Sequence, residues 1–334
     1  MNKIKNMKKS TRQTLLTLAM IIAFYIVIEV MIMTGNATRH LKSMLVPMCY
    51  NAIAAVSLNL VIGFLGELSL GQAAFMSLGA YSSCLFSIRM RRVLPAAVRF
   101  PLAVLLGGAV AAVFGIVIGV PVLRLSGDYL AIVTLAFGEI LRSVFINLDI
   151  TGGAAGLKKM PQDSSFTYGI IVLIIAVIVI SNIIDSKAGR AIMAVRDNTI
   201  AAASVGININ FYKVLVFVMA AFFGGCAGAL FGHNYSIITP GQFDYNKSIE
   251  ILLMVIFGGM GSVRGSIIAR VVITFLPEAM RGFADYRMLV YAVALILLML
   301  FGNNPKINRL KAKLFNRRNR DDNVRLTQAQ KEVK

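Results

Sequence analysis

The chain has 334 residues, of which 57% are hydrophobic, and its formal net charge is +19. With a mean hydropathy of +0.76, it has more apolar surface than one soluble core can bury, so the composition excludes a soluble globular protein. The charge is no sign of nucleic-acid binding, because much of it is concentrated at the two ends of the chain.

Long uncharged stretches predict transmembrane helices along the chain. A helix needs about 20 apolar residues to cross a hydrocarbon core of about 30 Å. About ten stretches approach this length, so we predict an all-α polytopic membrane protein. The predicted crossings are 14–34, 43–64, 71–88, 101–123, 128–147, 168–184, 212–232, 248–259, 264–279 and 288–302.

Basic residues at the ends of the chain predict its orientation. Five of them precede Thr14 and ten follow Gly302, and segments rich in Lys and Arg stay in the cytoplasm. We therefore predict a cytoplasmic basic N-terminus over 1–13, a transmembrane domain over 14–302 and a basic cytoplasmic tail over 303–334. The arginines between 89 and 99 fall outside in this scheme, and the sequence leaves the side of that loop open.

Two glycine-rich segments, 63–72 and 258–265, interrupt apolar stretches in the two halves of the chain. Glycine permits unwound backbone, which is tolerated at membrane depth only inside protein or against water. Such paired breaks predict an internal repeat around a transport pathway; two tight cytoplasmic turns are the alternative. The candidate path residues are Gly66, Glu67, Ser69, Gly71, Gln72, Gly259, Gly261 and, upstream of the first break, Asn51 and Asn59.

Ionisable residues within the apolar stretches need partners or a function. Glu139 and Arg142 are three residues apart and are predicted to pair on one helix. Glu67 has no evident partner nearby in the sequence, which makes it a candidate for a gate. Arg270 is predicted to extend its long side chain back toward the cytoplasm.

The segment 186–206 is polar and lies between two uncharged stretches, within a predicted cytoplasmic loop of about 185–211. Its charges are interleaved with Ala and Ile, which predicts a short amphipathic helix at the membrane surface, suited to a soluble partner. The candidate docking residues are Gly189, Arg190, Arg196, Asp197, Ala201, Ala202 and Gly206.

Catalytic and metal-binding patterns were sought without success. The chain has no His-Glu-x-x-His or Gly-x-Ser-x-Gly motif, and 258–265 lacks the Lys-Ser/Thr ending of a phosphate-binding loop. Its three cysteines and two histidines have no metal-ligand spacing. We therefore predict a non-enzymatic protein without a cofactor: a permease driven by a partner ATPase, or a self-contained channel or ion-coupled carrier. The docking segment favours the permease.

Several blocks of the sequence resemble one family. Residues 200–206 are similar to the docking signature of ABC importer permeases, with Ile200 where that signature has Glu. Branched-chain amino acid permeases of the LivM type are similar over 66–75, 127–139, 151–157, the whole segment 186–208, 254–265 and 276–278.

The resemblance implies a permease subunit of a bacterial plasma-membrane importer for leucine, isoleucine and valine. Its implied partners are a second, LivH-like permease, two LivG/LivF-like ATPase subunits that bind ATP and Mg, and an extracytoplasmic binding protein. Urea and short-amide importer permeases are similar in the same blocks, so the substrate stays open, as does a pairing of two identical permeases.

Overall fold

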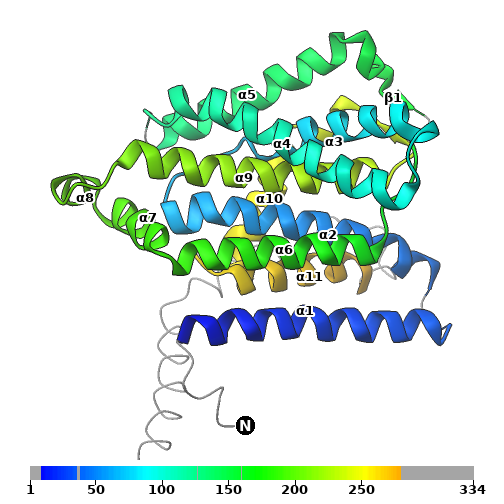
Figure 1. The fold of residues 1–334 in the computed structure, drawn as a ribbon, viewed down its shortest axis with the longest axis horizontal. Helices are drawn as coiled ribbons and strands as arrows, with labels where there is room; N and C mark the ends of the chain where they lie inside the picture. Colours follow the sequence, from blue (N-terminus) through cyan, green and yellow to red (C-terminus); the bar gives the residue numbers. More distant parts are fainter. Residues whose placement is uncertain (1–8, 36–37, 126, 159, 280–334) are drawn as a thin grey trace, which may run out of the picture. The chain divides into compact units, whose positions relative to one another are not determined.

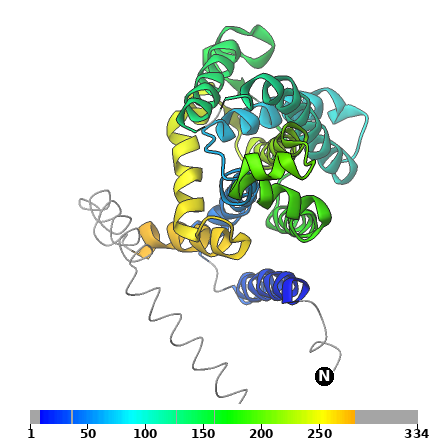
Figure 2. The same ribbon diagram turned by 90° about the vertical axis from the view of Figure 1, so that its left-hand side faces the viewer.

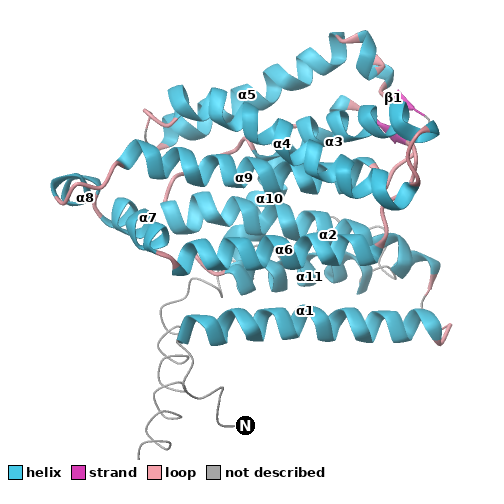
Figure 3. Cartoon of the chain, in the orientation of Figure 1, coloured by secondary structure: helices cyan, strands magenta, loops and turns pink. Residues whose placement is uncertain are grey.

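The computed structural model describes residues 9–35, 38–125, 127–158 and 160–279. The chain divides into two compact units, Met1–Thr274 and Phe275–Lys334. Nearly all described residues belong to the first unit. Its described part is almost entirely helical (Figure 3).

The elements follow the apolar stretches of the sequence. The long helices are α1 (Lys9–Met33), α2 (Arg39–Asn59), α3 (Gln72–Arg89), α4 (Ala96–Val122), α5 (Asp128–Asn147), α6 (Phe166–Asp185), α9 (Ile209–Gly232), α10 (Tyr245–Gly258) and α11 (Val263–Ala279). Shorter elements are a π-helix, η2 (Leu60–Leu65), the helices α7 (Lys187–Asp197) and α8 (Thr199–Ser204), four 3-10 turns, η3 (Met90–Arg92), η4 (Asp149–Thr151), η5 (Gly153–Ala155) and η6 (Pro240–Phe243), and the strands β1 (Leu157–Lys158) and β2 (Ile237–Ile238).

In the part of the chain that the structure describes, fewer helices than predicted are long and apolar enough to cross a membrane. Within the described residues, six have the required length and apolar character: Thr14–Met33, Leu41–Leu65, Ala96–Val122, Asp128–Asn147, Phe166–Asp185 and Ile209–Gly232. The predicted crossings 248–259 and 264–279 form one pair bent by 115°, which makes at most a seventh span and is visible between α10 (yellow) and α11 (orange) in Figure 2. The ten crossings and the internal repeat are therefore not confirmed, and the stretch 288–302 lies outside the described residues.

Small residues allow α3, α4 and α9 to pack closely. A Cβ on Gly79 of α3 would overlap the backbone of Gly225 of α9, and one on Gly228 would overlap the backbone of Met76. Helices in a membrane associate through such close backbone approach because lipid removes most of the hydrophobic driving force. This packing holds α9 as the central helix against which the candidate site is built.

The helices of the first unit run between two ends. One end, which we call the α7 end, holds α7 and α8; the other, the β1 end, holds the antiparallel pair of β1 and β2 (Figure 1). The segment between Arg89 and Arg99 lies at the β1 end, where Arg99 is buried and pairs with Asp163 at 2.5 Å. The segment 43–88 therefore runs to the α7 end and back (Figure 1).

Candidate functional site

The first glycine break is a change of helix type followed by backbone without regular secondary structure. α2 continues into the π-helix η2, which ends at Gly66 with a φ of 81°. A left-handed residue of this kind favours glycine because other side chains are strained there. The chain is then free of helix until α3 begins at Gln72, so the break predicted at 63–72 is confirmed as a structural feature.

The second break separates α10 from α11. Gly259 and Gly261 both have positive φ values, 88° and 79°, and together they allow the 115° bend. The backbones of Gly258 and Gly265 touch across this bend, where a Cβ on either would overlap the other. Glycine is therefore required here both for conformation and for space.

The two breaks lie against each other, joined by Asn59. Its Oδ1 accepts a hydrogen bond from the backbone N of Gly261 at 2.9 Å, and its Nδ2 donates to Ser266 Oγ at 3.0 Å. Asn59 is fully buried, and a Cβ on Gly63 would overlap both the Asn59 Oδ1 and the Gly261 N. Asn59 and Gly261, predicted separately as path candidates, thus meet in one contact. Together with Gly63 and Ser266 they form what we call the break junction.

The predicted docking segment forms two short helices. Ser186 caps α7 by accepting from the backbone N of Ala188 and Gly189, and Asn198 caps α8 by accepting from Ala201 N. Such caps satisfy backbone donors that a helix start leaves unpaired. Gly189 approaches the carbonyl oxygens at the end of α6 so closely that a Cβ would overlap them, which fixes α7 to the end of that crossing.

Arg196 connects the docking segment to the first break. Its Nη1 donates to the carbonyl oxygen of Gly63 at 3.1 Å, while its Nε and Nη2 donate to Asp197 Oδ1 at 3.0 and 2.9 Å. A Cβ on Gly66 would come within 2.6 Å of the Arg196 Cγ. Two features that the sequence predicted independently are therefore in direct contact, through residues 133 positions apart.

Glu67 has the partner that the sequence did not reveal. Its carboxylate pairs with the ammonium of Lys213, in the first turns of α9, and both side chains are largely buried, at 12% and 9% exposure. Glu67 has no partner nearby in the sequence, as predicted, because the lysine with which it pairs is 146 positions away. The sequence does contain one signal for this pair: Lys213 is a single lysine at the start of an otherwise uncharged predicted crossing.

Replacing Lys213 with methionine is expected to destabilise the protein by about 3 kcal/mol, because it leaves the Glu67 carboxylate buried and uncompensated. Thermal unfolding of the purified protein measures the effect. The double variant Lys213→Met with Glu67→Gln removes both charges and should recover most of the loss. Equal stability of the single and double variants would contradict a buried pair.

The residues after the break are held inside the protein. Ser69 and Gln72 are 3% and 2% exposed. Gln72 Nε2 donates to Ser57 Oγ at 2.7 Å, and Gly71 N donates to Ser69 Oγ at 3.4 Å. Ser69, Gly71 and Gln72 are thus surrounded by protein, as irregular backbone at membrane depth requires, whereas Gly66 at the start of the break is exposed. Asn51, two turns before Asn59, is also buried, and its Oδ1 has no hydrogen-bond partner among the described residues.

The outer side of the docking segment is exposed and partly apolar. Ile200 is 82% exposed and Val205 74%, while Ala202 is buried beneath them. Ala201 is also exposed, and Gly206 has a φ of 82° with open space around it. Exposed large apolar side chains beside small residues are typical of a surface that another protein covers.

Arg270 does not extend toward the α7 end as predicted. It is buried, and its Nη1 donates to Glu250 Oε1 on α10 at 3.3 Å. Glu250 also accepts from Lys247 Nζ at 2.8 Å. The prediction was wrong because the bend turns α11 so that the long Arg270 side chain reaches an acidic partner on α10.

Comparisons with known proteins agree on one family. The family described as "Branched-chain amino acid transport system / permease component" matches residues 41–302. The high-affinity branched-chain amino acid transport system permease protein LivM of Salmonella typhimurium is 32% identical over 288 residues, which cover 75% of this chain and 65% of that protein. LivM of Escherichia coli is 31% identical with the same coverage.

The similarity reaches other permeases as well. The ribose import permease protein RbsC of Haemophilus influenzae is 26% identical over 76% of this chain and 81% of its own length. The chain spans about two thirds of the length of the LivM relatives it matches, 65%. No solved structure matches the chain.

Proposed function

Since the chain belongs to the family of branched-chain amino acid transport permease components, we propose that it is the permease subunit of an ABC importer for leucine, isoleucine and valine. Part of the translocation path would lie at the glycine breaks, and the energy would come from partner ATPase subunits that bind ATP and Mg. The chain itself would have no catalytic role and bind no cofactor.

The contact between Arg196 and Gly63 carries this proposal. A permease driven by a partner needs a rigid connection from its docking surface to the residues that open the path. Here α7 is fixed to α6 by Gly189 and to the first break by Arg196. Movement of the docking segment would therefore be transmitted directly to η2 and, through Asn59, to the second break.

The proposed docking surface consists of the exposed part of α7 and α8, with Ala201 and Gly206 as its central residues and Arg190 at its edge. Ala202, which was predicted with them, is buried and would support this surface from beneath. Small residues allow a partner helix or groove to come close, and Ile200 and Val205 supply apolar contact area. We propose that the ATPase binds here, so the α7 end would face the cytoplasm. The N-terminal end of α1 lies at the same end, because Thr17 accepts a hydrogen bond from Arg264 beside the second break.

This orientation extends to the rest of the chain. The multi-pass protein would reside in a bacterial plasma membrane, with both basic termini, 1–13 and 303–334, in the cytoplasm and 14–302 as the transmembrane domain. The Arg89–Arg99 segment would then face outward as an exception to the usual charge bias, with Arg99 neutralised by Asp163.

The proposed assembly has a second permease, LivH-like or identical, two LivG/LivF-like ATPases and an extracytoplasmic binding protein. Sequence similarity to LivH of Escherichia coli, 27% over 34% of the chain, supports a related second permease. The binding protein would select the solute, so urea or a short amide is the alternative substrate. The similarity to a ribose permease shows that permeases related to this chain can differ in substrate.

A reconstitution experiment tests the proposal against an ion-coupled carrier. The chain alone in proteoliposomes should accumulate no labelled leucine under a proton or sodium gradient, and the assembly with ATPases and binding protein should accumulate it only with ATP. Competition by unlabelled isoleucine, valine, urea and ribose identifies the substrate. Gradient-driven accumulation by the chain alone would contradict an ATPase-driven permease.

A further inference from the structure

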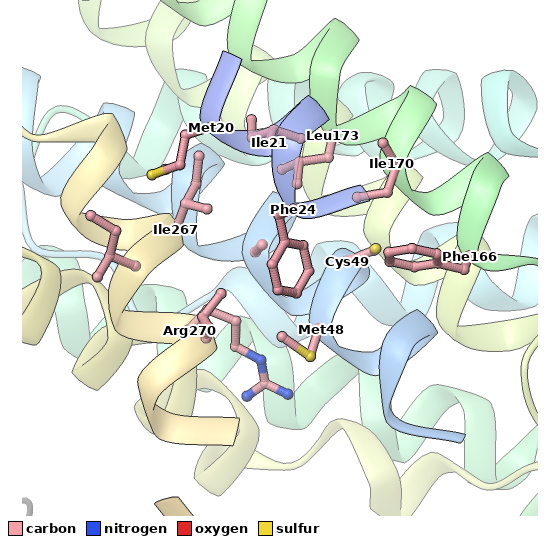
Figure 4. Close-up of a pocket in the computed structure, with 13 residues that line it drawn as sticks. Met20, Ile21, Phe24, Met48, Cys49, Phe166, Ile170, Leu173, Ile267 and Arg270 are labelled. Atoms are coloured by element: carbon pink, nitrogen blue, oxygen red, sulfur yellow. The ribbon is translucent and has the colours of Figure 1, made fainter. Parts of the chain in front are cut away.

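Two cavities, which we call hollows, lie in succession along α1. The first lies at the α7 end and has a volume of about 270 Å³; Thr14, Thr17, Asp185 and Arg264 contribute to its walls. The second lies deeper and has a volume of about 190 Å³, and its lining side chains come from α1, α2, α6 and α11 (Figure 4). The first hollow is largely polar and the second is apolar.

The two hollows succeed one another along the same faces of α1 and α11. Thr17 lines the first and Ile21 the second, four residues later on α1; Arg264 lines the first and Ile268 the second, four residues later on α11. Residues four apart lie one above the other on the same helix face. Arg264 Nε donates to Thr17 Oγ1 at 2.8 Å at the junction of the hollows. We call the whole feature the α1 groove.

The charges of the α1 groove lie at its polar end. Arg264 and Asp185 both line the first hollow, and no ion pair joins Asp185 to another described residue. The Nη2 of Arg264 is buried and has no hydrogen-bond partner in the described part of the chain. In the deeper hollow, Arg270 contributes its hydrocarbon stem, because its guanidinium is engaged by Glu250 and the carbonyl oxygen of Pro47.

We propose that the α1 groove binds one phospholipid with a zwitterionic amine head group of the phosphatidylethanolamine type. Its phosphate would lie at Arg264, its ammonium at Asp185, and one acyl chain would fill the apolar hollow. This assignment uses both charges, whereas an anionic lipid would leave its phosphate near an unbalanced carboxylate. α1 is the least buried of the six membrane-spanning helices, with 17% of its window buried, so a lipid there would fill space that protein does not.

Lipid retention tests the proposal. The full chain, purified from membranes in mild detergent, is incubated with phosphatidylethanolamine, phosphatidylcholine and phosphatidylglycerol of identical acyl chains, and bound lipid is counted by native mass spectrometry. We expect retention of the ethanolamine lipid to exceed that of the choline lipid by about threefold, because methylated ammonium cannot donate hydrogen bonds to Asp185. Arg264→Gln should lower retention of all three by about fivefold.

Three further variants make the assignment specific. Asp185→Asn should remove the preference for ethanolamine over choline without lowering choline retention. Ile268→Trp, at a half-exposed position at the apolar hollow, should reduce retention of every lipid without changing the preference. Arg124→Gln alters an exposed arginine outside the α1 groove and should change neither.

Equal retention of the ethanolamine and choline lipids by the unaltered chain would overturn the proposal. Stronger retention of phosphatidylglycerol than of the ethanolamine lipid would also overturn it, as would unchanged retention in Arg264→Gln. If Arg264→Gln aggregates, Ile268→Trp and Asp185→Asn decide the result alone.

Discussion

Replacing Gly63 with alanine is expected to reduce branched-chain amino acid uptake by about a hundredfold, as a misplacement of about 1 Å does at a functional site. The added Cβ would overlap Asn59 Oδ1 and the backbone N of Gly261, so the break junction has to separate. One of the two overlapping groups is backbone, which cannot rotate aside. Overpacking of this kind also costs about 1 to 3 kcal/mol of stability.

A matched alanine substitution isolates the effect. Gly241 has open space around its position and no positive φ, so Gly241→Ala should leave uptake and stability unchanged. Uptake by cells that express the assembled transporter, normalised to the amount of protein in the membrane, measures both variants. If Gly63→Ala transported normally, apposition of the two breaks would have no role in transport.

The second large effect is expected at Arg196. Arg196→Gln removes the charged donor to the Gly63 carbonyl, a bond worth about 1.5 to 3 kcal/mol, and should reduce uptake at least about tenfold. ATPase binding should persist, because this part of the arginine points into the protein and away from the docking surface. ATP hydrolysis would then continue without transport.

Arg190 supplies the control on the same helix. It is exposed, and among the described residues its side chain makes no hydrogen bond or ion pair. Arg190→Gln should therefore change uptake by less than about twofold, as expected for an exposed charge. Uptake and ATP hydrolysis are measured together for both variants; equal losses of uptake would mean that Arg196 acts only as a surface charge.

Local patterns in the sequence predicted most of the elements but not how they meet. The docking segment, the two glycine breaks and the pair of Glu139 with Arg142, observed at 2.8 Å, all depend on neighbours within a few residues. The bond from Arg196 to Gly63 and that from Gly261 to Asn59 join residues 133 and 202 positions apart. No spacing rule reaches that far, so the break junction could not be predicted.

The predicted number of crossings is not confirmed in the described part of the chain, for a different reason. Apolar length alone does not distinguish two crossings from one bent pair, and α10 has only 14 residues. α3 is a helix as predicted, but it is not among the six that are apolar enough to span a membrane alone. Its serines, such as Ser77 and Ser83, are buried against other helices, so packing within the protein replaces the apolar surface that lipid would require.

The reactivity of a cysteine introduced in place of Ser69 tests most directly whether the docking segment is coupled to the first break. Ser69→Cys is a conservative change at a residue that is 3% exposed, and the native cysteines Cys49, Cys84 and Cys226 are all buried. In the assembled transporter, its reaction rate with a small water-soluble thiol reagent is measured without nucleotide and with ATP trapped. We predict a rate that changes with ATP and loses this dependence when Arg196→Gln is added. A rate that is the same with and without ATP would contradict the account.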